Sequence, residues 1–422
     1  MHSVTNAIPT GTIASIPAKA HAHRALICAA LANSPSTILL SRTSKDIDAT
    51  MESLRGLGAH VVYENKVVTI TPGPVPAKGN VVPHESGTTL RLLLPVAASI
   101  CNDVDVDAKG RLPDRPLEPM LSEMKAHGVT FSQDKPPFTM TGHLQGGNFS
   151  MVGDVSSQFF SGLLLAAPQI GLSTITATTP LQSSDYVTLT TETMRDFGVE
   201  VEHTLPDTNI NEAFTVPFGA SFIGCDNYQI EGDWSNAAIW MVAAGMTGKP
   251  ITITGMNKNS VQADRRIMQV MIDAGCDVVW DGMNITVTGR ASKPLHADLE
   301  QMPDMLPVMA ALACSISGES SFVKGARLRL KESDRLVAVA NLVRDLGGTV
   351  REEGDDLYII GSGILKGGHG DCVNDHRLVM AGTLMALISK NPVTLKDSEA
   401  ITKSYPDFFE DWNLLGGDAH GI

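Results

Sequence analysis

Five segments of the chain share one pattern, in which an apolar-periodic stretch ends at a glycine and a β-rich run follows. The intervals between successive glycines are 70, 70, 77 and 72 residues. Glycine just beyond a helix supplies the left-handed residue that other side chains resist. An α/β unit of about 70 residues is therefore repeated at least five times, and the 75 residues after the fifth glycine leave room for a sixth unit. The five glycines are Gly58, Gly128, Gly198, Gly275 and Gly347.

This period is longer than that of the common solenoid repeats, so it predicts duplicated units that close into globular domains. A chain of 422 residues also exceeds the size of one compact core, and two or three domains are expected. No apolar run is long enough to span a bilayer, and the N-terminal residues do not have the pattern of a signal peptide. The net charge of −14 disfavours non-specific binding to nucleic acid.

The cysteines and histidines favour a reducing compartment and no metal site. The six cysteines are scattered along the chain without a close pair, which is typical of free thiols and not of a zinc knuckle. His21 and His23 have no nearby cysteine or carboxylate to complete a set of metal ligands. We therefore expect a cytoplasmic protein that holds no metal and has no nucleic-acid or membrane partner.

Several helices and strands can be placed from capping residues and spacing. Asp46 is expected to cap the helix that ends at the first of the five glycines, and Ser333 the helix that ends at the fifth. Pro116 is expected at the first position of a helix, where its missing N–H costs nothing. Two β-branched runs are expected to be strands: 67–70 and 251–254.

The chain contains no low-complexity linker, so any domain boundary is a tight crossing. The best candidates lie near residues 16–17 and near residues 231–233. Three of the five glycines lie between these points, and the other two follow. The N-terminal strand would then belong with the C-terminal half. The sequence thus predicts one domain of residues 1–16 plus 231–422 and a second of residues 17–230.

Several expected helix starts carry small polar or basic residues. The free backbone N–H groups and partial positive charge of a helix N-terminus favour anions. Any one of these segments is also explained by ordinary capping, but together they indicate a ligand with more than one phosphate or carboxylate. The segments are 19–24, 87–91, 156–158, 183–186 and 331–335.

Segment 331–335 is unusual because it contains two cations and two carboxylates within five residues. One interpretation is a solvated helix start with weak ion pairs. The other is a carboxylate that is held among cations for proton transfer, with Arg335 binding an anion through two hydrogen bonds. Segment 375–377 and Lys403 allow the same two interpretations.

Taken in order, these motifs resemble the EPSP synthases (3-phosphoshikimate 1-carboxyvinyltransferases), a family of enolpyruvyl transferases. The resemblance implies an α/β (α+β) fold of two domains, each built from three βαβαββ units in an inside-out barrel-like arrangement, with the active site in the cleft between them. The motifs that carry it are Gly87-Thr88 with Arg91, Arg115-Pro116, Ser156-Ser157-Gln158, Gly232-Asp233, Pro303-Asp304, Lys331-Glu332-Ser333-Asp334-Arg335, Asp375-His376-Arg377 and Lys403-Ser404-Tyr405-Pro406-Asp407.

The resemblance implies a reaction and a role for each residue. The enolpyruvyl (1-carboxyvinyl) group of phosphoenolpyruvate would move to the 5-hydroxyl of shikimate 3-phosphate and release phosphate, without a metal or organic cofactor, in a monomer that serves aromatic amino acid biosynthesis. Asp304 would assist deprotonation of the hydroxyl, Glu332 would protonate the methylene carbon, and Lys19 would help both transfers. The implied ligands of shikimate 3-phosphate are Lys19, Ala20, Arg24, Ser156, Ser157, Gln158, Ser183, Tyr186, Asp304 and Lys331. The implied ligands of phosphoenolpyruvate are Lys19, Gly87, Arg115, Gln158, Arg335, Arg377 and Lys403.

The chain departs from the family pattern around its first lysine. The family usually has serines on both sides, whereas this chain has Ala18 and Ala20. A lost hydrogen bond to a charged group typically costs ~1.5–3 kcal/mol. Weaker substrate binding, or compensation by His21 or His23, is therefore expected. Two further departures are Glu85 in place of a frequent Asn and Leu92 in place of a frequent Pro.

Two other functions remain open at this point. The sister family that acts on UDP-N-acetylglucosamine usually carries a reactive cysteine five residues before the arginine that corresponds to Arg115, and here that residue is Gly110. A non-catalytic binder of phosphorylated metabolites would be compatible with the missing serines. The presence of Asp304 and Glu332 argues against such a binder, because carboxylates that face anions do not help binding alone.

Overall fold

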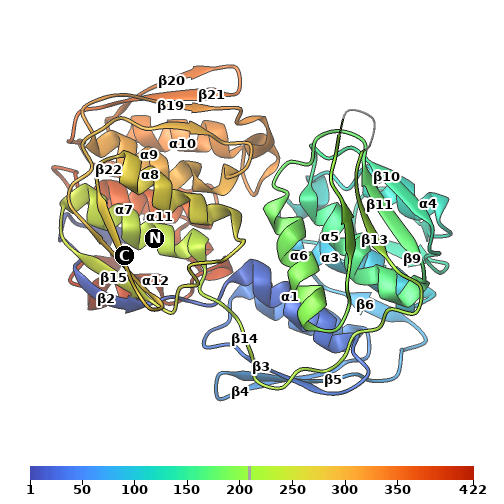
Figure 1. Ribbon diagram of the computed structural model, residues 1–422. Helices are drawn as coiled ribbons and strands as arrows, with labels where there is room; N and C mark the ends of the chain where they lie inside the picture. Colours follow the sequence, from blue (N-terminus) through green and yellow to red (C-terminus); the bar gives the residue numbers. More distant parts are fainter. Residues whose placement is uncertain (208–210) are drawn as a thin grey trace. The chain divides into compact units, whose positions relative to one another are not determined.

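The computed structural model describes residues 1–207 and 211–422, which form two compact units (Figure 1). The discontinuous unit consists of Met1–Ile16 and Glu231–Ile422, and the inserted unit consists of Pro17–Ile230. Each unit has a hydrophobic core of its own. Within the discontinuous unit, the backbone N–H of Asp233 donates to the carbonyl of Ile16 at 2.9 Å, so the chain returns to the point from which it left.

The inserted unit alternates helices with short strands. Its helices are α1 (Lys19–Ala30), α2 (Lys45–Gly56), α3 (Gly87–Ile100), α4 (Met120–Ala126), α5 (Ser157–Ile170) and α6 (Asp185–Asp196). Its strands are β3 (Ser36–Leu39), β4 (His60–Glu64), β5 (Val67–Thr71), β6 (Gly79–Val81), β7 (Asp103–Val106), β8 (Thr130–Phe131), β9 (Phe138–Thr141), β10 (Asn148–Met151), β11 (Ser173–Ala177), β12 (Glu202–Thr204), β13 (Glu212–Val216) and β14 (Tyr228–Gln229).

The discontinuous unit repeats the same alternation. Its helices are α7 (Trp234–Thr247), α8 (Ile267–Asp273), α9 (Leu306–Ser315), α10 (Arg335–Asp345), α11 (His376–Ala386) and α12 (Phe408–Leu414). Its strands are β1 (His2–Val4), β2 (Gly11–Ala14), β15 (Ile251–Thr254), β16 (Asp277–Asp281), β17 (Asn284–Thr288), β18 (His296–Asp298), β19 (Gly318–Val323), β20 (Thr349–Glu353), β21 (Asp356–Gly361), β22 (Gly368–Asp371), β23 (Val393–Lys396) and β24 (Ala419–Gly421). Short 3-10 helices include Pro303–Met305, Ala326–Leu330 and Ser398–Lys403.

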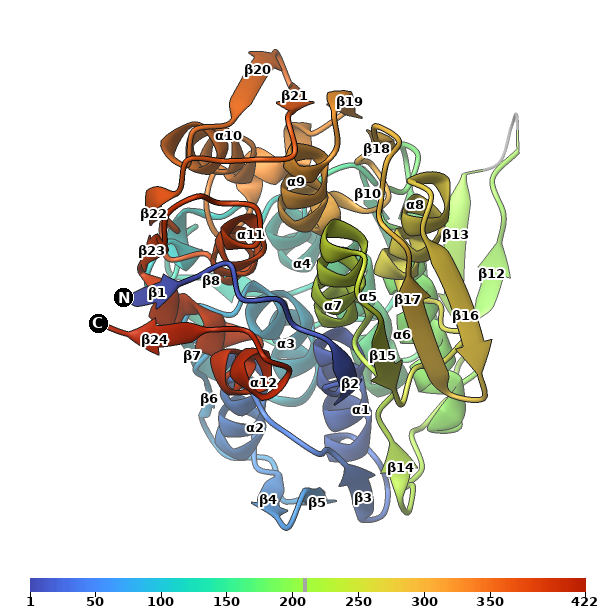
Figure 2. The ribbon, with the colours of Figure 1, turned by 90° about the vertical axis from the view of Figure 1, so that its left-hand side faces the viewer.

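Each sheet of the described residues has four strands in one common order. In the sheet β6-β7-β9-β8, β6 runs parallel to β7, and β9 pairs antiparallel with both β7 and β8. This is the βαβαββ unit that the family resemblance implies, and it occurs three times in each compact unit. Three repeats are completed by a strand that is distant in sequence, since β14 pairs with β3, β2 pairs with β15, and β1 pairs with β23 and β24. Figure 2 shows β2 beside β15, β17 and β16.

The glycines that reveal the repeat follow the second helix of each unit. All five have a positive φ, of 104°, 98°, 86°, 100° and 86° in chain order, which is the left-handed region expected of a helix C′ residue. A sixth member, Gly416, follows α12 with a φ of 93°. The repeat therefore extends through the last 75 residues of the chain, where the sequence had left room for it.

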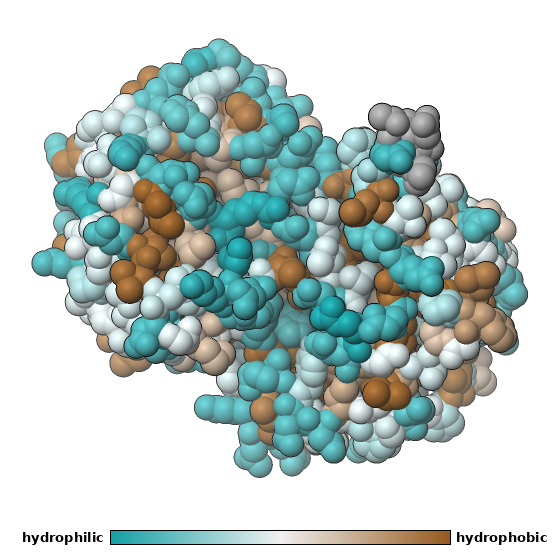
Figure 3. Space-filling model, viewed as in Figure 1, coloured by the Kyte–Doolittle hydropathy of each residue, from teal (hydrophilic) through white to brown (hydrophobic). Residues whose placement is uncertain are grey.

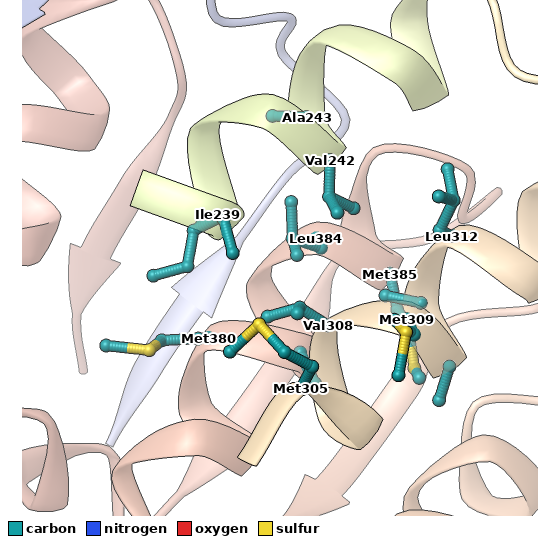
Figure 4. Close-up of a cluster of buried hydrophobic side chains, with 14 of the residues drawn as sticks. Ile239, Val242, Ala243, Met305, Val308, Met309, Leu312, Met380, Leu384 and Met385 are labelled. Atoms are coloured by element: carbon teal, nitrogen blue, oxygen red, sulfur yellow. The ribbon is translucent and has the colours of Figure 1, made fainter. Parts of the chain in front are cut away.

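The first helix of each repeat forms the centre of its unit. In the discontinuous unit, α7, α9 and α11 are apolar on all sides, and their side chains pack together, as Figure 4 shows for Ile239, Val308 and Leu384. A helix that is apolar all round is stable only when it is enclosed. The sheets enclose these helices, because strands such as β21 alternate buried Leu357 and Ile359 with more exposed neighbours.

Most of the expected elements are confirmed, but two caps are displaced. Ser44, not Asp46, caps α2, and its Oγ accepts from the N–H of Ile47 at 3.4 Å. Asp334, not Ser333, caps α10. In both places two polar residues lie within two positions of each other, and either could cap a helix by type alone. The strands expected at 67–70 and 251–254 are β5 and β15.

The prediction for Pro116 is also wrong, because α4 begins only at Met120 and Pro119 directly precedes it. Both prolines satisfy the preference of a helix start for a residue without an N–H, so residue type alone does not separate them. The other helix starts agree with the sequence. Lys19 begins α1, Gly87 begins α3 and Ser157 begins α5.

The surface contains both hydrophilic and hydrophobic residues. On the face shown in Figure 3, hydrophilic residues predominate, and the hydrophobic ones form small groups that are separated by polar atoms. Throughout residues 1–207 and 211–422, each helix is too short or too polar to cross a membrane.

Candidate active site

Charged side chains of the discontinuous unit converge on Asp304, which lies in the 3-10 helix before α9. Its Oδ1 accepts from Nη1 of Arg335 at 2.7 Å and lies 3.1 Å from Nζ of Lys331. Its Oδ2 lies 3.5 Å from Nη2 of Arg377 at the start of α11. The structure therefore brings together four residues that the sequence places in three separate motifs.

These neighbours determine the charge of Asp304. Burial raises the pKa of this carboxyl, but Lys331, Arg377 and Arg335 together outweigh burial and hold its pKa well below the usual range. Burial also lowers the pKa of Lys331, and the attraction of Asp304 offsets only part of this effect. Asp304 is thus ionised, and Lys331 is the cation in this group that loses a proton more readily than usual.

Arg335 is the hub of this cluster and is 1% exposed. Its Nη2 donates to Oε2 of Glu332 at 2.6 Å, and its Nε donates to Oδ2 of Asp375 at 3.0 Å, in addition to the bond to Asp304. The pKa of Arg335 is lowered by burial but raised further by these three carboxylates. The guanidinium is therefore directed at protein carboxylates, and its role as a ligand of phosphoenolpyruvate remains a prediction.

Asp375 is a functional candidate that lies in segment 375–377 but received no separate role from the sequence. It is fully buried and caps α11 by accepting from the backbone N–H of Arg377 at 3.0 Å. The hydroxyl of Ser333 donates to it at 3.0 Å. The residue before it, Asn374, accepts from Nζ of Lys403 at 2.8 Å through its carbonyl. The signal was an aspartate directly before the predicted helix, since such a residue positions the side chains of the first turn.

A second carboxylate that was missed, Asp264, is 1% exposed. The hydroxyl of Ser235, on α7, donates to Asp264. Burial raises the pKa of Asp264 to about 6, although Arg377 lowers it. A buried carboxyl with such a pKa can exchange a proton near neutral pH.

In the inserted unit, Lys19 is the first residue of α1. Its Nζ lies 2.8 Å from Oδ2 of Asp46, in the first turn of α2, and both side chains are partly exposed. The side chain of Asp46 thus binds Lys19, a proposed catalytic residue, instead of capping α2. Ala18 and Ala20 flank the lysine, and α1 begins without a side-chain cap.

Arg24 lies one turn further along α1 and is also 1% exposed. Its Nε donates to Oγ1 of Thr190 at 2.7 Å, and its Nη2 donates to Oγ of Ser161 at 3.2 Å and to the carbonyl of Tyr186 at 2.9 Å. Its Nη1 donates to the carbonyl of Ala20 at 2.7 Å. These hydroxyl and carbonyl partners carry no full negative charge, so they leave the charge of Arg24 unneutralised.

The side chains of Gln158, in the first turn of α5, and of Arg115 lie against the first turn of α3. The side chain of Gln158 accepts from Arg91 at 3.0 Å and donates to the hydroxyl of Thr88 at 2.9 Å. A Cβ atom at Gly87 would lie 2.5 Å from Nη1 of Arg115. The guanidinium of Arg115 can therefore lie against the helix start only because residue 87 has no side chain.

The remaining predicted ligands lie at the starts of α5 and α6. Ser156 caps α5, its Oγ accepting from the N–H of Gln158 at 3.3 Å, and Ser157 is the first residue of that helix. Ser183 has a φ of 55° and lies two residues before α6, in whose first turn Tyr186 lies. Segments 156–158 and 183–186 thus both lie at helix starts, as the sequence indicates.

The two histidines of α1 are bonded within the inserted unit. His21 contacts the hydroxyl of Tyr228 at 2.8 Å, and His23 contacts the hydroxyl of Thr50 at 2.7 Å. Across the described parts of the chain, no cluster of three or more His, Cys, Asp or Glu residues could hold a metal ion.

Comparison with known proteins decides the family. The family model described as EPSP synthase (3-phosphoshikimate 1-carboxyvinyltransferase) matches residues 7–412. The chain belongs to the EPSP synthase family. The similar proteins include 3-phosphoshikimate 1-carboxyvinyltransferases from Clostridium kluyveri, 36% identical over 97% of this chain and 95% of that one, and from Methanocorpusculum labreanum, 35% identical over 97% of each.

A solved structure agrees on the fold. EPSP synthase from Acinetobacter baumannii matches with a TM-score of 0.80 at 22% identity, over 100% of this chain and 99% of that one. The resemblance inferred from the motifs is thus confirmed, and so is the mixed α/β fold of βαβαββ repeats.

Proposed function

We propose that this member of the EPSP synthase family transfers the enolpyruvyl group of phosphoenolpyruvate to the 5-hydroxyl of shikimate 3-phosphate, as a step in aromatic amino acid biosynthesis. The observation that carries the proposal is the Asp304 cluster, in which two proton carriers, Asp304 and Glu332, are held by the same buried arginine. Two carboxylates placed among cations suit a reaction that moves protons between anionic substrates.

In this proposal residues of both units bind the same two substrates. The unneutralised charge of Arg24, together with the helix starts at Ser156 and Ser183, supports binding of shikimate 3-phosphate by the inserted unit. Arg115, beside Gly87, would bind phosphoenolpyruvate together with Arg335, Arg377 and Lys403 of the other unit. The remaining proposed ligands are Lys19, Ala20, Ser157, Gln158, Tyr186, Asp304 and Lys331.

The proposed chemistry is a proton exchange in two stages. The 5-hydroxyl attacks the second carbon of phosphoenolpyruvate while Asp304 assists removal of its proton. Glu332 protonates the methylene carbon, and Lys19 helps both transfers. Loss of phosphate and of one methyl proton then restores the double bond. Asp304 becomes a competent base only when its cations turn towards substrate, because they otherwise hold its pKa well below the usual range.

These steps need no metal or organic cofactor, since they consist of proton transfer and electrostatic stabilisation. All six cysteines are free, which supports a cytoplasmic location. We also propose that the chain acts as a monomer, which sedimentation of the protein would test.

The test is release of inorganic phosphate after the protein is mixed with phosphoenolpyruvate and one acceptor. Release with shikimate 3-phosphate alone is the expected result. Release of phosphate only with UDP-N-acetylglucosamine would assign the protein to the sister reaction. Release with neither acceptor would favour a non-catalytic binder of phosphorylated metabolites. The sister reaction is disfavoured because residue 110 is a glycine with a φ of 58°, a left-handed backbone that a cysteine rarely adopts.

A further inference from the structure

Two contacts join α1 to α2 one helical turn apart. Lys19 contacts Asp46 at 2.8 Å, and His23 contacts Thr50 at 2.7 Å. In each helix the two residues are four positions apart, so they lie on the same face of the helix. The two contacts therefore lie one above the other, and we call the Lys19–Asp46 contact the first rung and the His23–Thr50 contact the second rung. The first rung is partly exposed, whereas His23 and Thr50 have no exposed surface.

The second rung continues into α3. Oγ1 of Thr50 lies 2.7 Å from Oγ1 of Thr89, which is also fully buried. Thr89 donates to the backbone carbonyl of Asp46 at 3.2 Å and to Oγ of Ser86, the cap of α3, at 2.8 Å. The chain of hydroxyls that starts at His23 thus reaches the backbone of the residue that holds Lys19, and also the helix start that carries Gly87.

The number of hydroxyl protons determines which residue donates and which accepts in each hydrogen bond between His23 and Thr89. The carbonyl of Asp46 can only accept, so Thr89 must use its single hydroxyl proton on the side of Asp46 and Ser86 and must accept from Thr50. Thr50 has then used its own proton, and it must accept from His23. The imidazole therefore carries its proton on Nδ1, while Nε2, for which the described residues offer no hydrogen-bond partner, is left bare.

The surroundings of His23 agree with a neutral ring. Burial, together with the charges of Lys19 and Arg24, holds the pKa of His23 well below its ordinary value. A neutral imidazole with the proton on Nδ1 is a one-way donor, so its bond to Thr50 does not depend on pH in the neutral range.

We propose that His23 is a positioning residue for Lys19: its Nδ1–H begins a buried hydrogen-bond chain through Thr50 and Thr89 that fixes the first turns of α1, α2 and α3. The inference rests on the proposed function, in which Lys19 assists the proton transfers and residue 87 adjoins a substrate. A change of 1 Å in the place of a catalytic group can reduce a rate about 10²-fold. Placing Lys19 to that precision requires a fixed partner, and Asp46 is fixed by this chain.

The first test compares two replacements of His23 by steady-state phosphate release. His23→Asn keeps an N–H donor near the position of Nδ1, whereas His23→Leu fills similar space without one. We expect His23→Leu to lower kcat by about 10–100-fold. His23→Asn should remain close to the parent, and Thr50→Val should reproduce the loss while Thr50→Ser should not.

Coupling to Lys19 separates positioning from general damage. In the Lys19→Ala background, His23→Leu should reduce kcat little further, because no lysine remains to be misplaced. If the two substitutions acted independently, their fold-losses in kcat would instead multiply in the double variant. The matched control is Thr193→Val. Thr193 is 1% exposed, and among the described residues its hydroxyl bonds only to the carbonyl of Leu189 on its own helix. This substitution should leave kcat unchanged.

The tautomer offers a readout that does not depend on activity. In protein labelled with ¹⁵N-histidine, the signals lost in His23→Asn should show a protonated Nδ1 and a bare Nε2, unchanged between about pH 6 and 8. An Nε2–H tautomer would overturn the inference, and so would near-parent kcat in His23→Leu, or multiplying losses in the double variant. A parent protein that releases no phosphate would instead refute the proposed function.

Discussion

Arg335 shows how one buried side chain can govern the charge of several others. Its guanidinium contacts Asp304, Glu332 and Asp375, each through a different nitrogen or pair of nitrogens. Taking ions out of water is costly, and a buried group of this kind is stable only when its members remain paired. The cluster therefore holds Asp304 ionised, and it keeps both proposed proton carriers in place before substrate arrives.

The first prediction concerns Glu332. Glu332→Gln keeps the shape of the side chain and can still bind Arg335 through its carbonyl, but it cannot deliver a proton. General acid–base groups typically contribute ~10²–10⁴-fold in rate, and we expect a loss of that order in turnover. Affinity for shikimate 3-phosphate, measured by calorimetry, should change much less. Turnover near the parent rate would exclude Glu332 as the acid and would turn attention to Asp304 or Lys19.

Arg24→Ala is the comparison for Glu332→Gln and should weaken binding of shikimate 3-phosphate more than it slows the chemical step. Thermal unfolding should be followed in parallel, because Arg24 also joins α1 to Ser161 of α5 and Thr190 of α6. A loss of turnover at saturating substrate in a folded Arg24→Ala variant would contradict the division of roles.

The second prediction concerns Gly87. In Gly87→Ala the new methyl group would lie 2.5 Å from Nη1 of Arg115, so the guanidinium has to move. Loss of a hydrogen bond to a charged group costs ~1.5–3 kcal/mol, which corresponds to about a tenfold or larger rise in KM for phosphoenolpyruvate. The KM for shikimate 3-phosphate is the internal control and should change little. An equal rise in both KM values would mean that the effect is not confined to Arg115.

At the scale of the element, the C′ glycines make a prediction about stability. Gly416 has a φ of 93°, and a Cβ there would meet nothing closer than the carbonyl of Ile8 at 3.7 Å. Gly416→Ala therefore isolates the cost of the left-handed backbone, which is about 1–2 kcal/mol. Urea unfolding should show this loss. Gly421→Ala, where the new methyl group meets nothing within 4 Å and φ is not positive, is the control and should show none.

The elements also show what could be predicted from the sequence. The repeat could be predicted because the residue after each helix adopts a left-handed backbone conformation, which only glycine adopts at low cost. Gly416 was missed since the short α12 before it is rich in aromatic residues and lacks the regular stripe. The caps at Ser44 and Asp334 were missed because neighbouring polar residues have the same capping ability.

The site was predictable only where its residues are adjacent in sequence. Segment 331–335 is visible as a run of charge, and the family motifs point to each ligand in turn. The contact of Asp304 with Arg377 spans 73 positions, and that of Thr50 with Thr89 spans 39. No local pattern encodes such pairs, so neither the role of Arg335 as a hub nor the chain from His23 could be read from the residues alone.

At the scale of the whole molecule, the proposed ligands are divided between the two compact units. If both sets bind one pair of substrates, ligand binding should make the protein more compact. Small-angle scattering of Glu332→Gln, which is expected to turn over slowly, should show a smaller radius of gyration with both substrates than without them. Shikimate 3-phosphate alone and phosphoenolpyruvate alone are the controls. An unchanged radius, with binding shown by calorimetry, would contradict a shared site.

The place of the first strand has a consequence for how the protein is made. β1 lies between β23 and β24, so His2 pairs with both Leu395 and Gly421 (Figure 2). During translation the inserted unit, which has its own core, is complete before most of the discontinuous unit has been synthesised. Domains generally fold as units during synthesis. β1 must therefore wait for β24, and their sheet can close only after residue 421 has been synthesised.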